Sequence, residues 1–448
     1  MKRSMVVVTL LVVISILLTS CGGTPAPTGP VKITWWHAMG GTNGTAIDTL
    51  TKEFNASQTK CVAEAVFQNN YDDLLNKLKA GLQSKDVPAL TQMYDLGTRL
   101  LYDLDVAVPM QDFIDKEKFN VSDIEPNIMA YYSINKKLYS MPFNTSNPML
   151  YYNKTAFTAA GLDPNKPPRT FDEIAQFAAK LTKKDASGKV SMYGYSQAIY
   201  GWFFEQLLAA SGANFLDNGN GRDALATKAI FNGPEGQKIV QWWKDMYDKG
   251  IEGNYGRATA DTQKAFDAQT TAMMIESTAG LRSRLTAAQG KFELGTGFLP
   301  RPDEAAYKTS GTIIGGASLW ILKDRPKAEQ DCAWSMVKYL VSGHSQAEWH
   351  VATGYYPVNK AGYDDQLDKD WRAKYPQFQT AIDQLHNSPN IRQTQGAFTG
   401  VMPQARQTVE LAIESVLAGK ITVKEALDKA AVDVTAAIVD YNKTTAKK

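Results

Sequence analysis

The stretch from 31 to 95, "VKITWWHAMGGTNGTAIDTLTKEFNASQTKCVAEAVFQNNYDDLLNKLKAGLQSKDVPALTQMYD", alternates between two patterns. Three short runs are typical of buried strands: 31–38, 61–68 and 89–95. The segments between them have helical spacing, and Ile47, Leu50 and Phe54 fall on one helical face. Because strands that alternate with helices pair in parallel, this stretch predicts an α/β fold with helices flanking a sheet.

Polar and aromatic residues gather where these strands end. Trp36, His37, Tyr71 and Asp95 all lie at or just after the end of a predicted strand. In open α/β sheets, ligands bind beyond the carboxyl ends of the strands. A ligand site is therefore expected at this edge of the sheet.

A chain of 448 residues is about three times the length of a typical domain, so two lobes are expected. The segment "MPFNTSNPMLYYNK" (141–154) marks the start of a second lobe, and further strands are predicted within 271–278 and 310–323. Two helices are expected at the C-terminal end, one following Pro403 and one capped by Thr422 and Glu425. The predicted lobe bounds are 31–142 plus 311–365 for the N-terminal lobe, and 143–310 plus 366–448 for the C-terminal lobe.

The first residues predict export. Lys2 and Arg3 precede a short apolar run that ends in "LTSC", which is typical of a secretory signal and too short to indicate a membrane span. The stretch around Cys21 resembles the lipobox of bacterial lipoproteins, which predicts a signal peptide over 1–20 and a lipid on Cys21. Residues 21–30 are then expected to form a flexible Gly/Pro/Thr tether. The predicted location is the outer face of the cytoplasmic membrane or the periplasm. An ordinary cleaved signal and a retained anchor are the alternatives.

Charge and cysteine content narrow the functional classes. Loss of Lys2 and Arg3 with the signal takes the formal net charge of +2 to zero, so no electrostatic case for nucleic acid remains. Cys61 and Cys332 lie far apart and lack the spacing of a metal site. The export route permits a disulfide, but two independent buried thiols are the simpler expectation.

The sequence carries no phosphate-binding loop, nucleophile elbow or zinc-protease motif, and no cofactor is expected. Of the four histidines, His344 and His350 are six residues apart, which does not place two ligands on one helical face, so no metal is expected either. Aromatic pairs are abundant, for example Tyr151-Tyr152 and Tyr355-Tyr356. In a strand such neighbours face opposite sides, so one can serve the core while the other lines a cleft suited to sugars or polyols.

Seven motifs occur in order along the chain: "WWHAMGG" (35–41), "NNYDDLLNKLKAG" (69–81), "MYDLGT" (93–98), a long run from "PFNTSNPMLYYN" to "RTFDEIA" (142–175), "IIGGASLWIL" (313–322), "EWHVATGYYPV" (348–358) and "MPQAR" (402–406). Together they resemble the extracellular solute-binding proteins of ATP-driven importers, and most closely the branch that binds glycerol-3-phosphate. The resemblance implies a two-lobe periplasmic-binding-protein fold of type II. Each lobe is a sheet flanked by helices, and the ligand cleft lies between the lobes. It also implies a monomer without catalysis that delivers a small ligand to membrane permease subunits.

The resemblance further implies a set of ligand-binding residues, matched motif by motif. Acid, hydroxyl, aromatic and glycine backbone groups of this kind can hold a polyol and an oxyanion. Where the register is ambiguous by one residue, both positions are included. The set is Tyr71, Asp95, Ser146, Trp202, Ser277 or Thr278, Gly315 or Gly316, and Tyr355.

One position departs from the family pattern. In "GAFTGVMPQAR" (396–406), Phe398 stands where the relative is expected to have an arginine, the residue best suited to phosphate. Arg392 and Arg406 lie nearby, and Arg406 matches the arginine of the family's own motif, so its role is expected to be structural. Phe398 is predicted to face the ligand and to favour a sugar or polyol.

Three functions therefore stay open. The first is an importer-linked binding lipoprotein for glycerol-3-phosphate or a glycerophosphodiester. The second is a binding protein for a sugar or oligosaccharide that does not recognise phosphate. A cell-surface enzyme acting on glycosides, with a carboxylate pair across the same cleft, is the third.

Overall fold

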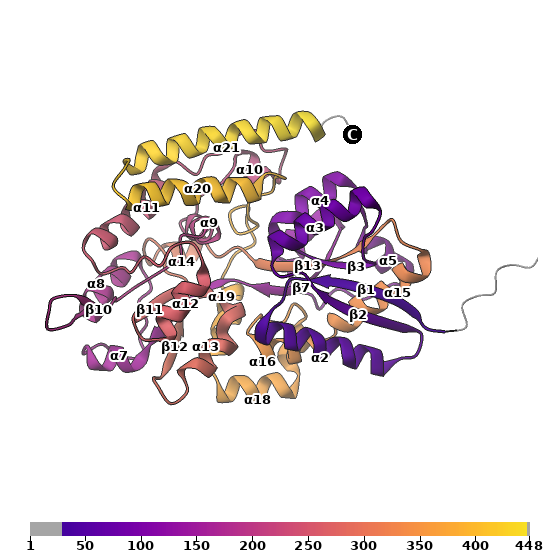
Figure 1. The fold of residues 1–448 in the computed structure, drawn as a ribbon, viewed down its shortest axis with the longest axis horizontal. Coiled ribbons are helices and arrows are strands. Elements are labelled where there is room, and N and C mark those ends of the chain that lie inside the picture. Colours follow the sequence, from indigo (N-terminus) through magenta and orange to yellow (C-terminus); the bar gives the residue numbers. More distant parts are fainter. Residues whose placement is uncertain (1–28, 446–448) are drawn as a thin grey trace, which may run out of the picture.

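The computed structural model describes residues 29–445, so Cys21, the predicted signal and most of the tether lie outside the described residues. Figure 1 shows two lobes side by side, one built mainly from the N-terminal third of the chain and one from the middle. Each lobe has a sheet covered by helices. The predicted two-lobe α/β fold is thereby confirmed.

The first lobe contains a six-stranded sheet in the order β2-β1-β3-β13-β4, with β7 also paired to β13. The three strands predicted from 31–95 run parallel, as expected. β13 runs antiparallel to β3, because it enters this sheet from the opposite lobe late in the chain. The strands are β1 (Val31–His37), β2 (Cys61–Phe67), β3 (Leu90–Tyr94), β4 (Ala107–Val108), β7 (Met141–Ser146) and β13 (Gly315–Leu322).

Helices cover this sheet, and their apolar faces follow the sequence pattern. In α2, Ile47, Leu50 and Phe54 are all buried on the predicted face. A short hairpin, β5 (Ser133–Ile134) and β6 (Lys137–Leu138), lies nearby in the chain. The elements around the sheet include α2 (Gly41–Ser57), α3 (Tyr71–Ser84), η1 (Asp95–Gly97), α4 (Thr98–Leu104), α5 (Met110–Glu117), α6 (Pro126–Tyr132), α15 (Lys327–Leu340) and α16 (Gly343–Thr353).

The second lobe is organised on a three-stranded sheet in the order β11-β8-β12, with β8 antiparallel to both neighbours. The strands are β8 (Pro148–Asn153), β11 (Met273–Ser277) and β12 (Leu294–Gly297). β8 is buried on both faces, because Tyr152 belongs to the main hydrophobic core whereas Tyr151 belongs to a smaller cluster on the other side. The neighbouring tyrosines therefore face opposite ways, as their strand pattern predicted.

The remaining elements complete the second lobe and the C-terminal region. Thr170 and Glu173 form the capping box that their spacing indicates, with both reciprocal hydrogen bonds present. The elements are α7 (Lys154–Ala159), α8 (Phe171–Leu181), β9 (Lys183–Lys184), β10 (Val190–Met192), α9 (Gly201–Ala210), α10 (Asp217–Gly221), α11 (Pro234–Asp248), α12 (Thr259–Asp267), η2 (Thr278–Gly280), α13 (Leu281–Ala288), α14 (Ala306–Thr309), α17 (Lys360–Asp364), α18 (Gln366–Lys374), α19 (Gln377–His386), α20 (Met402–Leu417) and α21 (Val423–Thr445).

The chain crosses between the sheets at Asn147, between β7 and β8. Because β7 stays in the first sheet up to Ser146, the predicted lobe boundary after residue 142 falls inside this strand. β13 pairs with β7 beside the crossing, with Gly316 opposite Thr145. Two segments far apart in the sequence thus lie together where the lobes meet.

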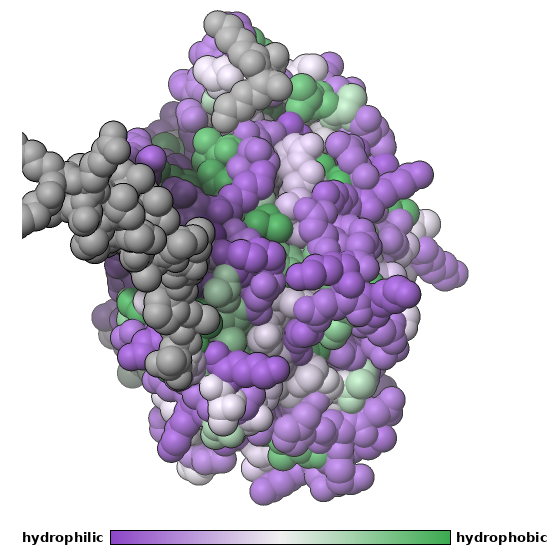
Figure 2. Space-filling model, turned by 90° about the vertical axis from the view of Figure 1, so that its right-hand side faces the viewer, coloured by the Kyte–Doolittle hydropathy of each residue, from purple (hydrophilic) through white to green (hydrophobic). Residues whose placement is uncertain are grey.

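The face at the end of the first lobe is largely polar. Figure 2 looks onto the end of the first lobe, where hydrophilic residues dominate and hydrophobic ones are scattered. Within 29–445, none of the helices combines the length and the apolar character needed to cross a membrane.

Candidate ligand-binding cavity

A cavity of about 980 Å³ lies between the lobes. Its walls come from the ends of β1, β2 and β3 in the first lobe, and from α9, α12 and the end of β11 in the second. α20 contributes one residue, Arg406. The cavity therefore lies at the carboxyl ends of the parallel strands, where the sequence predicted a ligand site.

The structure brings together seven of the ten predicted ligand-binding residues. Thr278 does not line the cavity: it is buried, and its N–H donates to the Asn147 carbonyl over 3.0 Å. Gly315 lies beneath the Trp202 ring, so closely that a Cβ there would be 2.4 Å from it. The seven that line the cavity are Tyr71, Asp95, Ser146, Trp202, Ser277, Gly316 and Tyr355.

The tyrosines of the cavity wall are held by a buried polar chain. The Asn144 side-chain amide donates to the Tyr71 hydroxyl over 2.9 Å and accepts from Gln92 over 2.7 Å. Burial raises the pKa values of Tyr71 and Tyr355, so both hydroxyls stay protonated. Because the Tyr71 oxygen already accepts from Asn144, its own hydrogen can be donated to the neighbouring Tyr355 hydroxyl or to a group in the cavity.

Ring stacking fixes the same wall. The Tyr71 and Tyr94 rings are stacked, with centroids 5.2 Å apart. Tyr355 stacks on Trp349 of α16 at 5.5 Å, while its neighbour Tyr356 is fully buried and donates to the Ser146 carbonyl. Of these two neighbours, Tyr355 therefore lines the cavity and Tyr356 belongs to the core.

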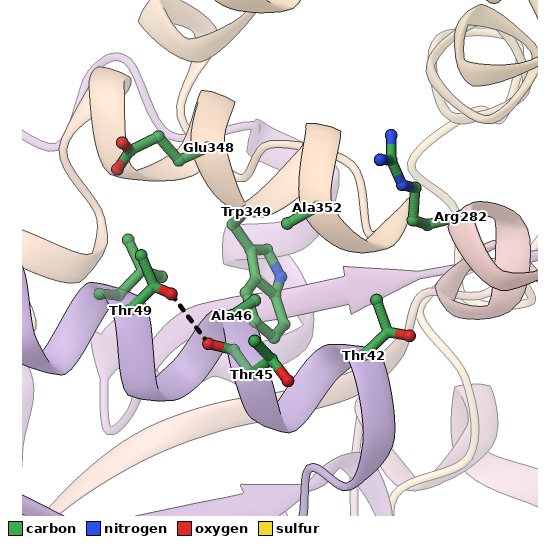
Figure 3. Close-up of a pocket in the computed structure, with 9 residues that line it drawn as sticks. Thr42, Thr45, Ala46, Thr49, Arg282, Glu348, Trp349 and Ala352 are labelled. Atoms are coloured by element: carbon green, nitrogen blue, oxygen red, sulfur yellow. Dashed lines mark hydrogen bonds between the residues drawn. The ribbon is translucent and has the colours of Figure 1, made fainter. Parts of the chain in front are cut away.

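Trp349 also lines a smaller cavity behind this wall, of about 390 Å³. Figure 3 shows its ring reaching from α16 toward the threonines of α2, with Arg282 of α13 beside them. Thr42 lines both cavities. The Trp349 ring thus stacks on Tyr355 and also lines the space between α2 and α16.

Arg406 is the residue that sequence reasoning left out of the site. It is only 4 % exposed and lines the cavity. Its Nη2 donates to Asp95 over 2.9 Å and to Glu205 over 2.8 Å, and its Nε donates to Glu205 over 3.0 Å. Burial opposes the charge, but the two carboxylates raise the pKa of Arg406, so it stays a cation.

The ion pairs use only part of the guanidinium. Nη1 of Arg406 makes no hydrogen bond to any of the described residues, and it is absent from the fully buried unpaired atoms. Burial raises the pKa of Asp95, and Arg406 opposes that shift. The sequence signal for this role was the position of Arg406 near the start of a helix that follows a glycine-rich loop.

The structure places Phe398 outside this cavity, in contrast to the prediction. Its ring lines a separate cavity of about 560 Å³, between the guanidinium groups of Arg99 and Arg222 at 5.2 and 4.9 Å from the ring centroid. Its N–H donates to the Asn220 carbonyl over 2.8 Å, which fixes the loop in this orientation. Phe398 thus faces two arginines of another cavity, whereas Arg406, four positions beyond the start of α20, lines the cavity between the lobes.

Two further groups give the cavity a mixed character. Trp202 is 6 % exposed, and its indole N–H is buried with no hydrogen-bond partner among the described residues. Glu276 is 3 % exposed and accepts hydrogen bonds from Gln263 and from the Ser277 N–H. The cavity therefore offers aromatic faces, neutral donors, carboxylates and two arginines, the buried Arg406 and the partly exposed Arg257, which pairs with Glu410 and Glu414. Residues 29–445 contain no clustered metal site.

Glu276 gives the cavity a pH dependence. Burial raises its pKa from 4.5 to about 7, so the folded protein binds this proton more tightly than the unfolded chain does. The contribution of Glu276 to stability therefore falls as pH rises from 4.5 to about 7. We expect Glu276→Gln to remove this fall, worth up to about 3 kcal/mol, in urea unfolding at pH 5 and pH 8. The exposed Glu293→Gln is the control, and an unchanged slope in Glu276→Gln would rule Glu276 out as its source.

A two-lobe α/β fold with a polar, aromatic cavity between the lobes is the architecture of a protein that captures a small ligand. Residues 49–380 match the family model described as bacterial extracellular solute-binding protein. The chain belongs to this family. Its homologues are the substrate-binding proteins of ATP-driven importers.

Individual relatives narrow the comparison. The sn-glycerol-3-phosphate-binding periplasmic protein UgpB of Escherichia coli K12 is 35 % identical over 403 residues, which cover 89 % of this chain and 90 % of that protein. The structure of UgpB from Mycobacterium tuberculosis in complex with glycerophosphocholine superposes with a TM-score of 0.78 at 20 % identity, over 92 % of this chain and 99 % of that one. A cyclic α-maltosyl-1,6-maltose-binding protein from Arthrobacter globiformis superposes with a TM-score of 0.72 at 25 % identity, over 92 % and 99 %. These relatives are solute-binding proteins rather than enzymes.

Proposed function

We propose that this protein captures glycerol-3-phosphate or a glycerophosphodiester as a monomer and delivers it to the permease of an ATP-driven importer. The observation that carries this proposal is the free Nη1 side of Arg406, a fixed cation in a cavity lined by neutral donors. A guanidinium binds phosphate oxygens with strong, directional hydrogen bonds. The E. coli relative is named for sn-glycerol-3-phosphate, and the M. tuberculosis structure holds glycerophosphocholine, which supports the same ligand class.

The cavity residues divide into two roles under this proposal. Arg406 holds the phosphate together with neutral donors, whose hydrogen bonds replace the water that the anion loses. Asp95 accepts hydrogen bonds from glycerol hydroxyls, and Trp202 supplies the apolar floor. The neutral donors are Tyr71, Ser146, Ser277, Gly316 through its backbone N–H, and Tyr355.

A sugar ligand is the second candidate. Tyr200 and Trp202 line the cavity together, and ring faces of this kind cover the apolar face of a sugar. The replacement of an arginine by Phe398 no longer supports this candidate, because Phe398 lies in a different cavity. A sugar hydroxyl would offer the free Nη1 group of Arg406 a weaker, neutral acceptor than a phosphate oxygen, so phosphate is favoured.

A ligand panel separates these candidates. A ligand that binds only the folded protein stabilises it, so sn-glycerol-3-phosphate and glycerophosphocholine are expected to raise the melting temperature. At a ligand concentration of one hundred times Kd, the free energy of unfolding should increase by about 2.7 kcal/mol. Glycerol and inorganic phosphate test each half of the ligand, and mono- to trisaccharides test the second candidate. Stabilisation by saccharides alone would overturn the phosphate proposal. Mass spectrometry of each mixture tests for cleavage, and any turnover of a glycoside or diester would contradict a pure binding role.

We further propose that Cys21 carries a lipid that anchors the protein on the outer face of the membrane. The motif around Cys21 supports it, and membership of an extracellular family agrees with export. Cells that express the full chain and are fed an alkyne-tagged fatty acid are expected to label the wild type and not Cys21→Ala. Equal labelling of both chains would refute attachment at Cys21.

A further inference from the structure

Cys61 and Cys332 lie side by side in the fold, although 270 residues of chain separate them. In the parallel register of β1 and β2, Cys61 is paired with Val31. The Cys332 thiol of α15 donates to the Val31 carbonyl, with 3.7 Å between sulfur and oxygen. The Cys332 sulfur therefore lies at the end of the first two strands where Cys61 begins β2.

Other contacts agree with this juxtaposition. α15 packs on both β1 and β2. Both cysteines are free thiols in this structure, and burial together with the neighbouring Cys61 raises the pKa of the Cys332 thiol. Cys61 is 7 % exposed and Cys332 is 2 % exposed, so a bond between them would be shielded from reductants. They lie at the amino ends of the strands, away from the ligand cavity at the carboxyl ends.

We propose that Cys61 and Cys332 form an intramolecular disulfide in the exported protein. The family is extracellular, and disulfides persist in that environment. The oxidant is a protein or small-molecule disulfide. One cysteine thiolate attacks it and releases a thiol, and the second thiolate then displaces the other thiol as the Cys61–Cys332 bond forms. Two protons and two electrons thus pass from the cysteines to the oxidant.

The bond would fasten together two chain segments that enter the first lobe separately. β2 belongs to the first segment, whereas α15 follows β13, which returns from the second lobe. The chain between the cysteines contains the whole three-stranded sheet of the second lobe. A disulfide that closes such a long loop restricts the unfolded chain strongly, so the bond stabilises the first lobe without joining it to the second.

The test is a peptide map of the full chain isolated after export, alkylated without reduction and digested with trypsin. Each cysteine falls in its own peptide, 61–77 and 328–338, so Cys21 does not interfere. We expect the two peptides as one cross-linked species, which separates after reduction. Recovery of both as alkylated single peptides from the unreduced protein would overturn the proposal.

A thermal unfolding measurement tests whether the disulfide stabilises the first lobe. Reductant during unfolding is expected to lower the melting temperature of the wild type by about 5 °C. Cys332→Ala lacks the bond and should show no shift with reductant. A wild type with the cross-link but the same melting temperature in both conditions would overturn the stabilising role. The peptide map itself needs no variant, so a poorly folded variant does not affect it.

Discussion

Arg406→Gln is expected to lose both ligand binding and stability. The substitution leaves the carboxylates of Asp95 and Glu205, which are 6 % and 2 % exposed, without their shared cation. Breaking a buried ion pair by removing one partner typically costs about 3–5 kcal/mol. The lost charged hydrogen bonds to phosphate, worth about 1.5–3 kcal/mol, should weaken glycerol-3-phosphate binding by about 10- to 100-fold. Urea unfolding and titration calorimetry measure the two losses.

Two variants separate binding from folding at this position. Arg406→Lys keeps the charge but not the planar fork, so it should retain more stability than Arg406→Gln and still bind the phosphate ligand less tightly. The matched control is Arg169→Gln, whose ion pair with Glu304 is exposed at 45 % and 59 % and should contribute less than about 1 kcal/mol. Wild-type affinity of a folded Arg406→Gln for glycerol-3-phosphate would remove Arg406 from the proposed site.

Gly316→Ala is expected to be the most damaging change of a single methyl group. Gly316 has a φ of +94°, and a Cβ there would be 1.9 Å from the Asn144 carbonyl oxygen. The β13–β7 pairing next to the crossing cannot move away without breaking its ladder. We expect a loss of about 3 kcal/mol or more, from the backbone strain and the clash together, measured by urea unfolding.

Gly280→Ala is the control for this prediction. Gly280 also lines the cavity, but its φ is −93° and nothing lies within 4 Å of a Cβ placed there. Its stability should stay within about 1 kcal/mol of the wild type. If Gly316→Ala were equally mild, the close approach of β13 to β7 would not be a constraint on the fold.

The local pattern predicted the elements well, because each signal lies within one helix or strand. The capping box of Thr170 and Glu173 and the buried face of α2 depend on spacings of three or four residues, and both are present. The site was predicted where a residue directly follows a strand, as with Asp95 after β3. The lobe boundary was less accurate, since nothing local distinguishes the end of β7 from the start of β8.

Phe398 and Arg406 show where motif matching fails. Both lie in "GAFTGVMPQAR", and the side chain that reaches the cavity is decided by the path of the loop and the first turn of α20. The hydrogen bond from Phe398 to Asn220 turns its ring toward Arg99 and Arg222, whereas Glu205 and Asp95 draw Arg406 into the cavity. These partners are distant in the sequence, so no local pattern encodes them.

The sequence by itself determined the family, the alternation of strands and helices, and the edge of the sheet where the cavity lies. Periodicity and ordered motifs carry that information, because they reflect short-range geometry that any compact fold must satisfy. Only the tertiary structure decided that Arg406 rather than Phe398 faces the ligand cavity, and that Cys61 and Cys332 are neighbours. Both depend on contacts between distant segments, which burial and ion pairing fix only once the two lobes have packed.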